Sequence, residues 1–166
     1  MSIAFSENAK RRIADTRSKY PNAQAALLPV LHIAQEEFGY ISDDVSKVVA
    51  DTLGLPYAHV HGVVTFYTMF HQHKVGRHEL MVCTNVSCML RRGYDILAHL
   101  EKRLGIKAGE TTPDGMFTLI EEECLAACAN APMMICGDNY HLDLTEEKVD
   151  AILDEMRKET RSDARA

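Results

Sequence analysis

The chain has 166 residues, of which 46% are hydrophobic and 25% are charged, proportions typical of a globular protein with a core. Its 18 Lys and Arg residues against 24 Asp and Glu residues give a net charge of −6, which argues against a nucleic-acid partner. The longest mostly apolar stretches reach about a dozen residues, short of the ~18–20 that a membrane span needs. The first residues contain no apolar signal segment, so we expect an intracellular protein.

Charge divides the sequence into two parts. Residues 1–75 contain seven basic and seven acidic residues, whereas residues 76–166 contain 11 basic and 17 acidic ones and therefore carry the whole net charge. All five cysteines also lie in the second part. We predict two domains, residues 1–75 and 76–160, followed by a polar tail at 161–166.

Helical signals follow one another through the first part. Capping serines, a helix-initiating proline and helix-ending glycines alternate with apolar residues spaced three and four apart. Pro29 interrupts this spacing and is a candidate for a kink. The pattern predicts a bundle of four helices: from the Ser6 cap to Tyr20, from Asn22 to Phe38, from the Ser42 cap to Leu53, and from Pro56, as the first helical residue, through Val64.

Strand and helix patterns alternate in the second part. A strand, a helix and a second strand precede a hairpin and a final helix capped by Thr145. This order predicts an α+β chain whose second domain is a compact sheet covered by two helices. The predicted elements are strands at His78–Cys83, Met116–Ile120, Met133–Cys136 and Tyr140–Leu142, and a helix at Leu90–Leu104.

Four of the cysteines form two pairs, each placed after a predicted strand. Cys83 and Cys88 are spaced C-x4-C, and Cys124 and Cys128 are spaced C-x3-C. Zinc sites usually use tighter C-x2-C pairs, whereas a 2Fe-2S cluster is larger and wider loops can hold it. The spacing therefore favours a 2Fe-2S cluster, with a zinc site and unligated thiols as the alternatives.

The fifth cysteine, Cys136, lies in an apolar strand, where a thiol behaves as a small hydrophobic group. We therefore expect it to pack in the core and not to act as a ligand. A thiol-disulfide enzyme would use a C-x-x-C pair at the start of a helix, and no two cysteines in this chain have that spacing.

At these residues the sequence resembles the E-type 2Fe-2S subunit of NADH:quinone oxidoreductase (respiratory complex I). The same family includes small subunits of NAD-linked hydrogenases and formate dehydrogenases. The resemblance covers nearly the whole chain. It rests on LLPVLHIAQEEFGYIS from Leu27, GVVTFYTMF from Gly62, CTNVSCMLRRG from Cys83, ECLAACANAPMM from Glu123 and NYHLDLTEEKVDAIL from Asn139. One departure is Ala126, where relatives usually have glycine, so we expect this loop to need a compatible backbone angle.

The resemblance implies an N-terminal helical bundle followed by a thioredoxin-like α/β domain. It implies that Cys83, Cys88, Cys124 and Cys128 ligate one 2Fe-2S cluster and that no residue is catalytic. It also implies that the chain is an electron-transfer subunit of a proton-translocating NADH dehydrogenase (quinone). The resemblance further implies that FMN and NADH are bound by a partner flavoprotein subunit, and the lack of a G-x-G-x-x-G motif in this chain agrees with that expectation.

The same resemblance implies contacts with other subunits of the peripheral arm. A cytoplasmic location, with attachment to the inner membrane only through the complex, is expected. The equivalent subunit of a hydrogenase or formate dehydrogenase is the alternative within the family, and a zinc-binding interaction module is the alternative outside it.

Three further features allow two interpretations each. The histidines between His59 and His78 are interpreted as solvated or interface residues and not as a metal site. Glu121, Glu122 and Glu123 form a solvated loop or else lower the potential of a neighbouring cluster through their charge. The bond before Pro132 is a candidate cis peptide, which the sequence cannot decide.

Overall fold

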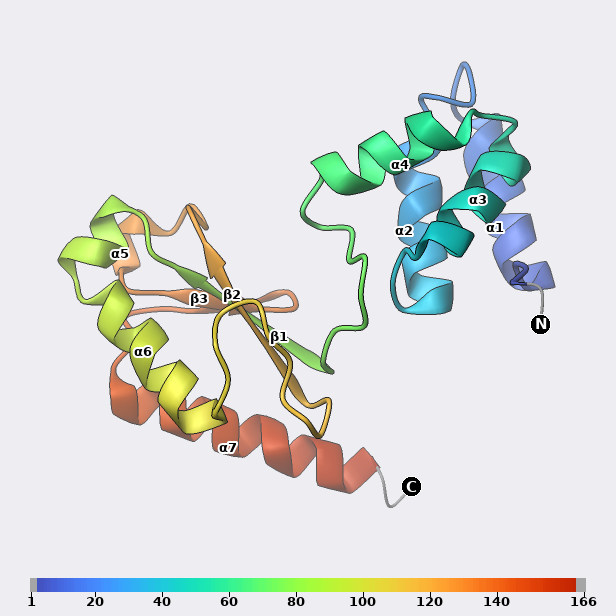
Figure 1. The fold of residues 1–166 in the computed structure, drawn as a ribbon. Coiled ribbons are helices and arrows are strands. Elements are labelled where there is room, and N and C mark those ends of the chain that lie inside the picture. Colours follow the sequence, from blue (N-terminus) through green and yellow to red (C-terminus); the bar gives the residue numbers. More distant parts are fainter. Residues whose placement is uncertain (1–2, 164–166) are drawn as a thin grey trace. The chain divides into compact units, whose positions relative to one another are not determined.

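The computed structural model describes residues 3–163, with side chains up to residue 158. The chain divides into two compact units between Val75 and Gly76. The first unit is helical, and the second combines helices with a sheet (Figure 1). No helix within residues 3–163 has the length and apolar character needed to cross a membrane.

The first unit contains the helices that the sequence predicts. The side chains of Ser6 and Ser42 cap two of them, each accepting a backbone N–H bond from the third residue onward at 3.2 Å. Gly39 and Gly54 end two helices in the left-handed conformation. The helices are α1 (Glu7–Ser18), α2 (Leu27–Phe38), α3 (Asp43–Leu53) and α4 (Tyr57–Phe66).

Two helix starts differ from the prediction. Helix α2 begins at Leu27 and not at Asn22, because residues 23–26 form a turn in which the Asn22 side chain accepts the Ala25 N–H bond at 2.9 Å. Pro29 consequently lies in the first turn of α2, where its missing N–H is not needed, and the predicted kink has no basis. Pro56 is the N-cap of α4 and not its first helical residue.

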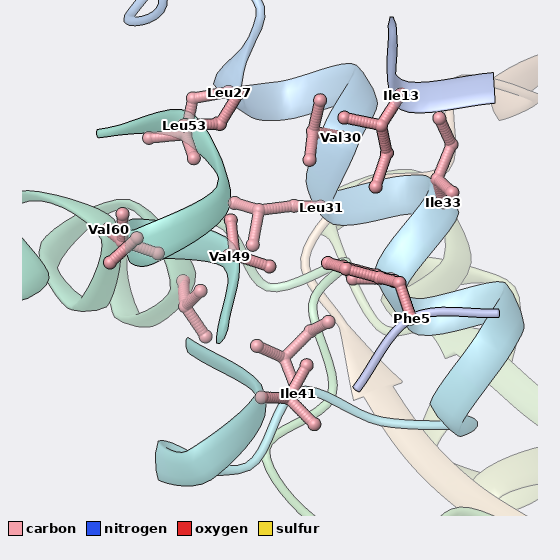
Figure 2. Packing of buried hydrophobic residues seen from close by; sticks show 14 of the residues in the cluster. Phe5, Ile13, Leu27, Val30, Leu31, Ile33, Ile41, Val49, Leu53 and Val60 are labelled. Atoms are coloured by element: carbon pink, nitrogen blue, oxygen red, sulfur yellow. The ribbon is translucent and has the colours of Figure 1, made fainter. Parts of the chain in front are cut away.

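Apolar side chains from all four helices form the core of the first unit (Figure 2). Helix α1 contributes only Ala9 and Ile13 to this core. It is held further by the ring contact of Phe5 with Phe38, whose centroids are 5.3 Å apart, and by an ion pair between Arg12 and Glu36 at 2.6 Å. Leu31 of α2 lies at the centre of this core and is fully buried.

The second unit contains a four-stranded sheet in the order β2-β1-β3-β4. Strand β1 is one of the two inner strands: it pairs in parallel with β2 and antiparallel with β3, and β4 pairs antiparallel with β3. The sheet and two covering helices confirm the predicted α+β architecture. The elements are β1 (His78–Cys83), α5 (Val86–Leu90), α6 (Gly93–Leu104), β2 (Phe117–Glu122), a 3-10 turn (Cys128–Asn130), β3 (Met134–Cys136), β4 (Asn139–His141) and α7 (Glu146–Asp163).

The two faces of the sheet have different coverings. Leu80 and Val82 of β1 point into a core shared with α6 and α7, whereas Met81 and Cys83 belong to a separate cluster with Cys88, Met133 and Ile135. This alternation follows from the two-residue period of a strand. Strand β1 thus directs Cys83 to the face opposite the two long helices.

One predicted helix is divided in two. The segment predicted as a single helix from Leu90 to Leu104 breaks at Arg92, whose φ of 69° is left-handed, so that α5 ends and α6 begins at Gly93. At the other end of the unit, α7 continues through Asp163, into the segment predicted as a polar tail. Residues 164–166 of that tail lie outside the described residues.

The start of α6 packs directly on the backbone that carries the first cysteine pair. A Cβ atom at Gly93 would lie 2.8 Å from the Cys88 carbonyl oxygen and 3.1 Å from the Cys83 carbonyl oxygen. Because the first distance is shorter than any normal contact of a Cβ atom, only glycine fits here without a backbone shift. Gly93 therefore fixes how closely α5 and α6 approach the end of β1.

Replacing Leu31 by alanine tests the core of the first unit. The substitution should lower the free energy of unfolding by about 2–5 kcal/mol, because it leaves a cavity among fully buried side chains. Urea unfolding followed by far-UV circular dichroism measures the loss. Phe66→Ala is the control, because 76% of the Phe66 side chain is exposed and its removal should change stability by less than about 0.5 kcal/mol. Equal losses in the two variants would contradict the packing.

Replacing Gly93 by alanine tests the close packing at the first cysteine pair. The methyl group should lower the free energy of unfolding by about 1–3 kcal/mol and expose the thiols of Cys83 and Cys88. Urea unfolding and the rate of thiol modification in the metal-free protein measure these effects. Gly62→Ala is the matched control, since a Cβ atom at this helical glycine meets nothing within 4 Å. Unchanged stability together with unchanged thiol protection in Gly93→Ala would refute the contact.

Candidate functional site

The first cysteine pair is rigidly placed and buried. Cys83 is the last residue of β1, and Cys88 lies in the short helix α5 that follows. The side chain of Asn85 begins α5 by accepting the Val86 N–H bond at 2.6 Å. Cys83 and Cys88 are 4% and 2% exposed, so both sulfurs are removed from water.

The second pair lies in an exposed loop after β2. Cys124 and Cys128 are both exposed, and Cys128 begins the 3-10 turn. Ala126 between them has a φ of 63°, which confirms the expectation that alanine at this position needs an unusual backbone angle. For a residue with a Cβ atom this conformation costs about 1–2 kcal/mol, which glycine would avoid.

Hydrogen bonds hold the two cysteine loops together. The Cys83 thiol donates to the carbonyl oxygen of Glu123 at 3.7 Å, and the backbone N–H of Thr84 donates to the carbonyl oxygen of Glu122 at 3.0 Å. The Thr84 hydroxyl also donates to the Glu121 carboxylate at 2.8 Å. Glu121 is therefore bound to the first loop and is not only a solvated side chain.

Three of the four paired cysteines line one small cavity. Its walls include Cys83 and Cys88 from the first loop and Cys128 from the second, together with Asn85 and Met133. Cys124 is not among the residues that line this cavity. The pKa of the Cys88 thiol is raised to about 11, mainly because the thiol is buried and to a smaller extent because it forms a hydrogen bond with Cys83. In the metal-free protein this thiol is therefore neutral at pH 7.

The remaining cysteine is placed differently. Cys136 is buried in the core that contains α6 and α7, and its Cα partner in the neighbouring strand is Leu80. Cys83 lies on the other face of the same sheet. This position confirms that Cys136 packs in the core. The peptide bond between Ala131 and Pro132, just before β3, is cis.

Sequence reasoning missed two residues that shape the site. Gly93 was predicted only as part of a longer helix, yet its missing side chain allows the backbone of α6 to reach both Cys83 and Cys88. Thr84 bridges the loops although it carries no metal-binding group. A glycine and a hydroxyl residue within ten positions of a cysteine pair were the available signals, but they are common in loops and carry no specific meaning alone.

The donors at this site suit a soft metal centre. Thiolates are the ligands preferred by iron–sulfur clusters and also by zinc. Two buried thiols from one loop and two exposed thiols from a second loop match the division of a 2Fe-2S cluster, in which two cysteines hold each iron. The donor types therefore fit such a group, although within residues 3–163 no three His, Cys, Asp or Glu side chains already lie close enough together to hold a metal ion, so Cys124 and Cys128 would have to move toward Cys83 and Cys88.

Comparison with known proteins agrees with the fold. The profile of the thioredoxin-like [2Fe-2S] ferredoxin family matches residues 13–157. An E-type subunit of the NADH-quinone oxidoreductase of Rhizobium meliloti (strain 1021) is 45% identical over 148 residues, which is 89% of this chain and 88% of the relative. The mitochondrial NADH dehydrogenase [ubiquinone] flavoprotein 2 of Dictyostelium discoideum is 40% identical over 156 residues, 92% of this chain and 63% of the relative.

A solved structure with low sequence identity shares the architecture. The NAD+-reducing [NiFe]-hydrogenase in the air-oxidized state aligns with a TM-score of 0.70 at 19% identity, covering 80% of this chain and 23% of the hydrogenase chain. At this identity the similarity concerns the fold alone. The profile match and the relatives at 40–45% identity together show that the chain belongs to the thioredoxin-like [2Fe-2S] ferredoxin family.

Proposed function

We propose that this chain is the electron-transfer subunit of an NADH-quinone oxidoreductase and holds one 2Fe-2S cluster through Cys83, Cys88, Cys124 and Cys128. The observation that carries the proposal is the convergence of Cys83, Cys88 and Cys128 on one cavity, although the two loops are far apart in sequence. Cys124 completes the set from the loop that already supplies Cys128.

A bound 2Fe-2S cluster supplies one-electron transfer between protein-held redox partners. The residues of this chain hold and insulate that group. Cys83 and Cys88 keep one side away from water, and the backbone hydrogen bond between Met133 and the Cys88 sulfur is of the kind that tunes cluster potentials in such sites. Each of the four thiols must lose its proton on ligation, so the neutral Cys88 releases one proton on assembly.

The relatives' names support the assignment to a respiratory complex. The relatives at 40–45% identity are subunits of NADH-quinone oxidoreductase or NADH dehydrogenase, whereas the hydrogenase similarity is at 19% identity. The partner that delivers electrons is then the flavoprotein subunit that binds FMN and NADH. Other peripheral-arm subunits hold the assembly at the inner membrane. The soluble hydrogenase or formate dehydrogenase assembly is the second candidate.

Alanine substitution of each cysteine tests the ligand set. Cys83→Ala, Cys88→Ala, Cys124→Ala and Cys128→Ala should each lose most of the visible absorption and the reduced-state EPR signal, because each removes one of four ligands. Cys136→Ala is the matched control: it removes a buried thiol on the opposite face and should retain the cluster. Iron and acid-labile sulfide, each near two per chain in the wild type, quantify the result.

Other outcomes of the same experiments would contradict the proposal. A colourless wild-type protein with one zinc and no iron would identify a zinc-binding module. Loss of the cluster in Cys136→Ala but not in Cys124→Ala would show a different ligand set.

A separate measurement tests the proposed partner. Reduction of the bound cluster by NADH only when the FMN-loaded flavoprotein is present would support the flavoprotein subunit as the electron donor.

The acidic residues before Cys124 allow a test of what sets the midpoint reduction potential of the proposed cluster. Glu121→Gln and Glu123→Gln should raise the midpoint potential, because reduction adds negative charge and removing a nearby negative charge favours it. A unit charge 4 to 8 Å away is worth about 0.5–1 kcal/mol in water, equivalent to about 20–40 mV. Asp154→Asn is the control, since Asp154 pairs with Arg157, which stacks on Phe117 at the opposite end of β2. A redox titration that gives equal potentials for all variants would refute this influence.

A further inference from the structure

The second cysteine loop, residues 123–130, is fastened at its start to the first cysteine loop. The Thr84 hydroxyl donates to the Glu121 carboxylate at 2.8 Å, and the Thr84 N–H donates to the Glu122 carbonyl oxygen at 3.0 Å. Thr84 is 8% exposed and directly follows Cys83 in the sequence. This anchor therefore ties the start of the second loop to a buried point beside a buried thiol.

A second anchor fastens the other end of this loop. The side-chain amide of Asn130 donates to the Asp143 carboxylate at 3.1 Å, and the Asp143 N–H donates to the Asn130 carbonyl oxygen at 2.9 Å. The Asp143 carbonyl oxygen in turn accepts a hydrogen bond from the Lys148 ammonium group of α7 at 2.8 Å. The end of the loop is therefore joined through Asp143 to the first turns of α7.

The residues between the two anchors are held less firmly. Leu125 and Ala127 are partly buried against the cluster of side chains that contains the first pair of thiols, whereas Cys124 and Cys128 are exposed. Ala126 has a left-handed φ of 63°, a conformation that is unfavourable for a residue with a Cβ atom. The packing of two partly buried side chains has to offset this backbone preference, so the position of the loop depends on the anchors at its ends.

We propose that Thr84 and Asn130 are positioning residues for the 2Fe-2S cluster, because they hold both ends of the second cysteine loop. This inference rests on the proposed function. A thiolate that dissociates from iron on an anchored loop stays within reach of that iron, and its high effective concentration favours rebinding. Losing either anchor gives the loop conformational freedom that rebinding has to remove. The two anchors therefore slow the release of the cluster, although neither residue is a ligand to iron.

The rate of cluster release from the loaded full-length chain tests this proposal. Thr84→Val keeps the shape of the side chain but removes the hydroxyl that donates to Glu121, and it should speed release about three- to tenfold. Thr84→Ser keeps a hydroxyl at this position and should restore the rate to within about twofold of wild type. The decay of visible absorption after addition of excess EDTA in the absence of oxygen gives the rate.

Thr111→Val is the matched control for the loss of a hydroxyl group. The hydroxyl groups of Thr111 and Thr118 are hydrogen-bonded to each other at 2.8 Å, and Thr118 lies near the start of β2, whereas Glu122 at its end is paired with Cys83. Thr111→Val should lower the free energy of unfolding of the metal-free protein about as much as Thr84→Val does, but it should leave cluster release within about twofold of wild type. A purely structural role of Thr84 predicts instead that both variants release the cluster at the same rate.

Asn130→Ala tests the second anchor at an exposed position, and it should also speed release about three- to tenfold. If Thr84→Val assembles no cluster, the rate in Asn130→Ala decides. Release at the wild-type rate in either variant, or equal release from Thr84→Val and Thr111→Val, would overturn the positioning role and leave the proposed function intact. A wild-type chain that assembles no iron and sulfide would overturn both.

Discussion

The close contact of Gly93 with the backbone of Cys83 and Cys88 is the constraint on which the candidate site depends. Strand β1 is one of the two inner strands of the sheet, and its end is fixed by pairing with β2 and β3. Gly93 then brings α6 against that end, and the short helix α5 has to fit between them. The first pair of thiols is therefore placed by the sheet and by α6, while the second pair lies on a loop that hydrogen bonds attach to the first.

Much of the fold follows from local sequence signals for the beginnings and ends of helices. Ser6 and Ser42 cap helices, and Gly39 and Gly54 end them, where the sequence predicts. The prediction fails where two local signals compete. Apolar residues at helical spacing continue through residues 90–104, but the left-handed backbone conformation of Arg92 breaks the helix at that residue. No proline in the segment predicts the break. Asn22 similarly resembles a helix cap but initiates a turn instead.

The site was predictable in its residue types but not in its arrangement. The spacing of the cysteines identifies two loops. Because side chains alternate between the two faces of a sheet, the positions of Cys83 and Cys136 in their strands place them on opposite faces once the strand pairing is known. Neither pattern shows which thiols are buried, because burial depends on the packing of α5 and α6 against the strand ends. The bridge from Thr84 to Glu121 joins residues 37 positions apart and has no local sequence signal.

Burial of the first thiol pair also bears on how a partner reaches the proposed cluster. With Cys83 and Cys88 almost fully buried, an approach on their side has to pass over α5, whereas Cys124 and Cys128 already face solvent. Residues 76–166 have six more acidic than basic residues, so a centre that gains negative charge on reduction would do so in a unit that is already negatively charged. Beside α5, Arg92 is paired with Asp95 at 2.6 Å, and Glu146 and Glu147 line the same cavity as Arg91 and Arg92, so acidic side chains balance the two arginines there.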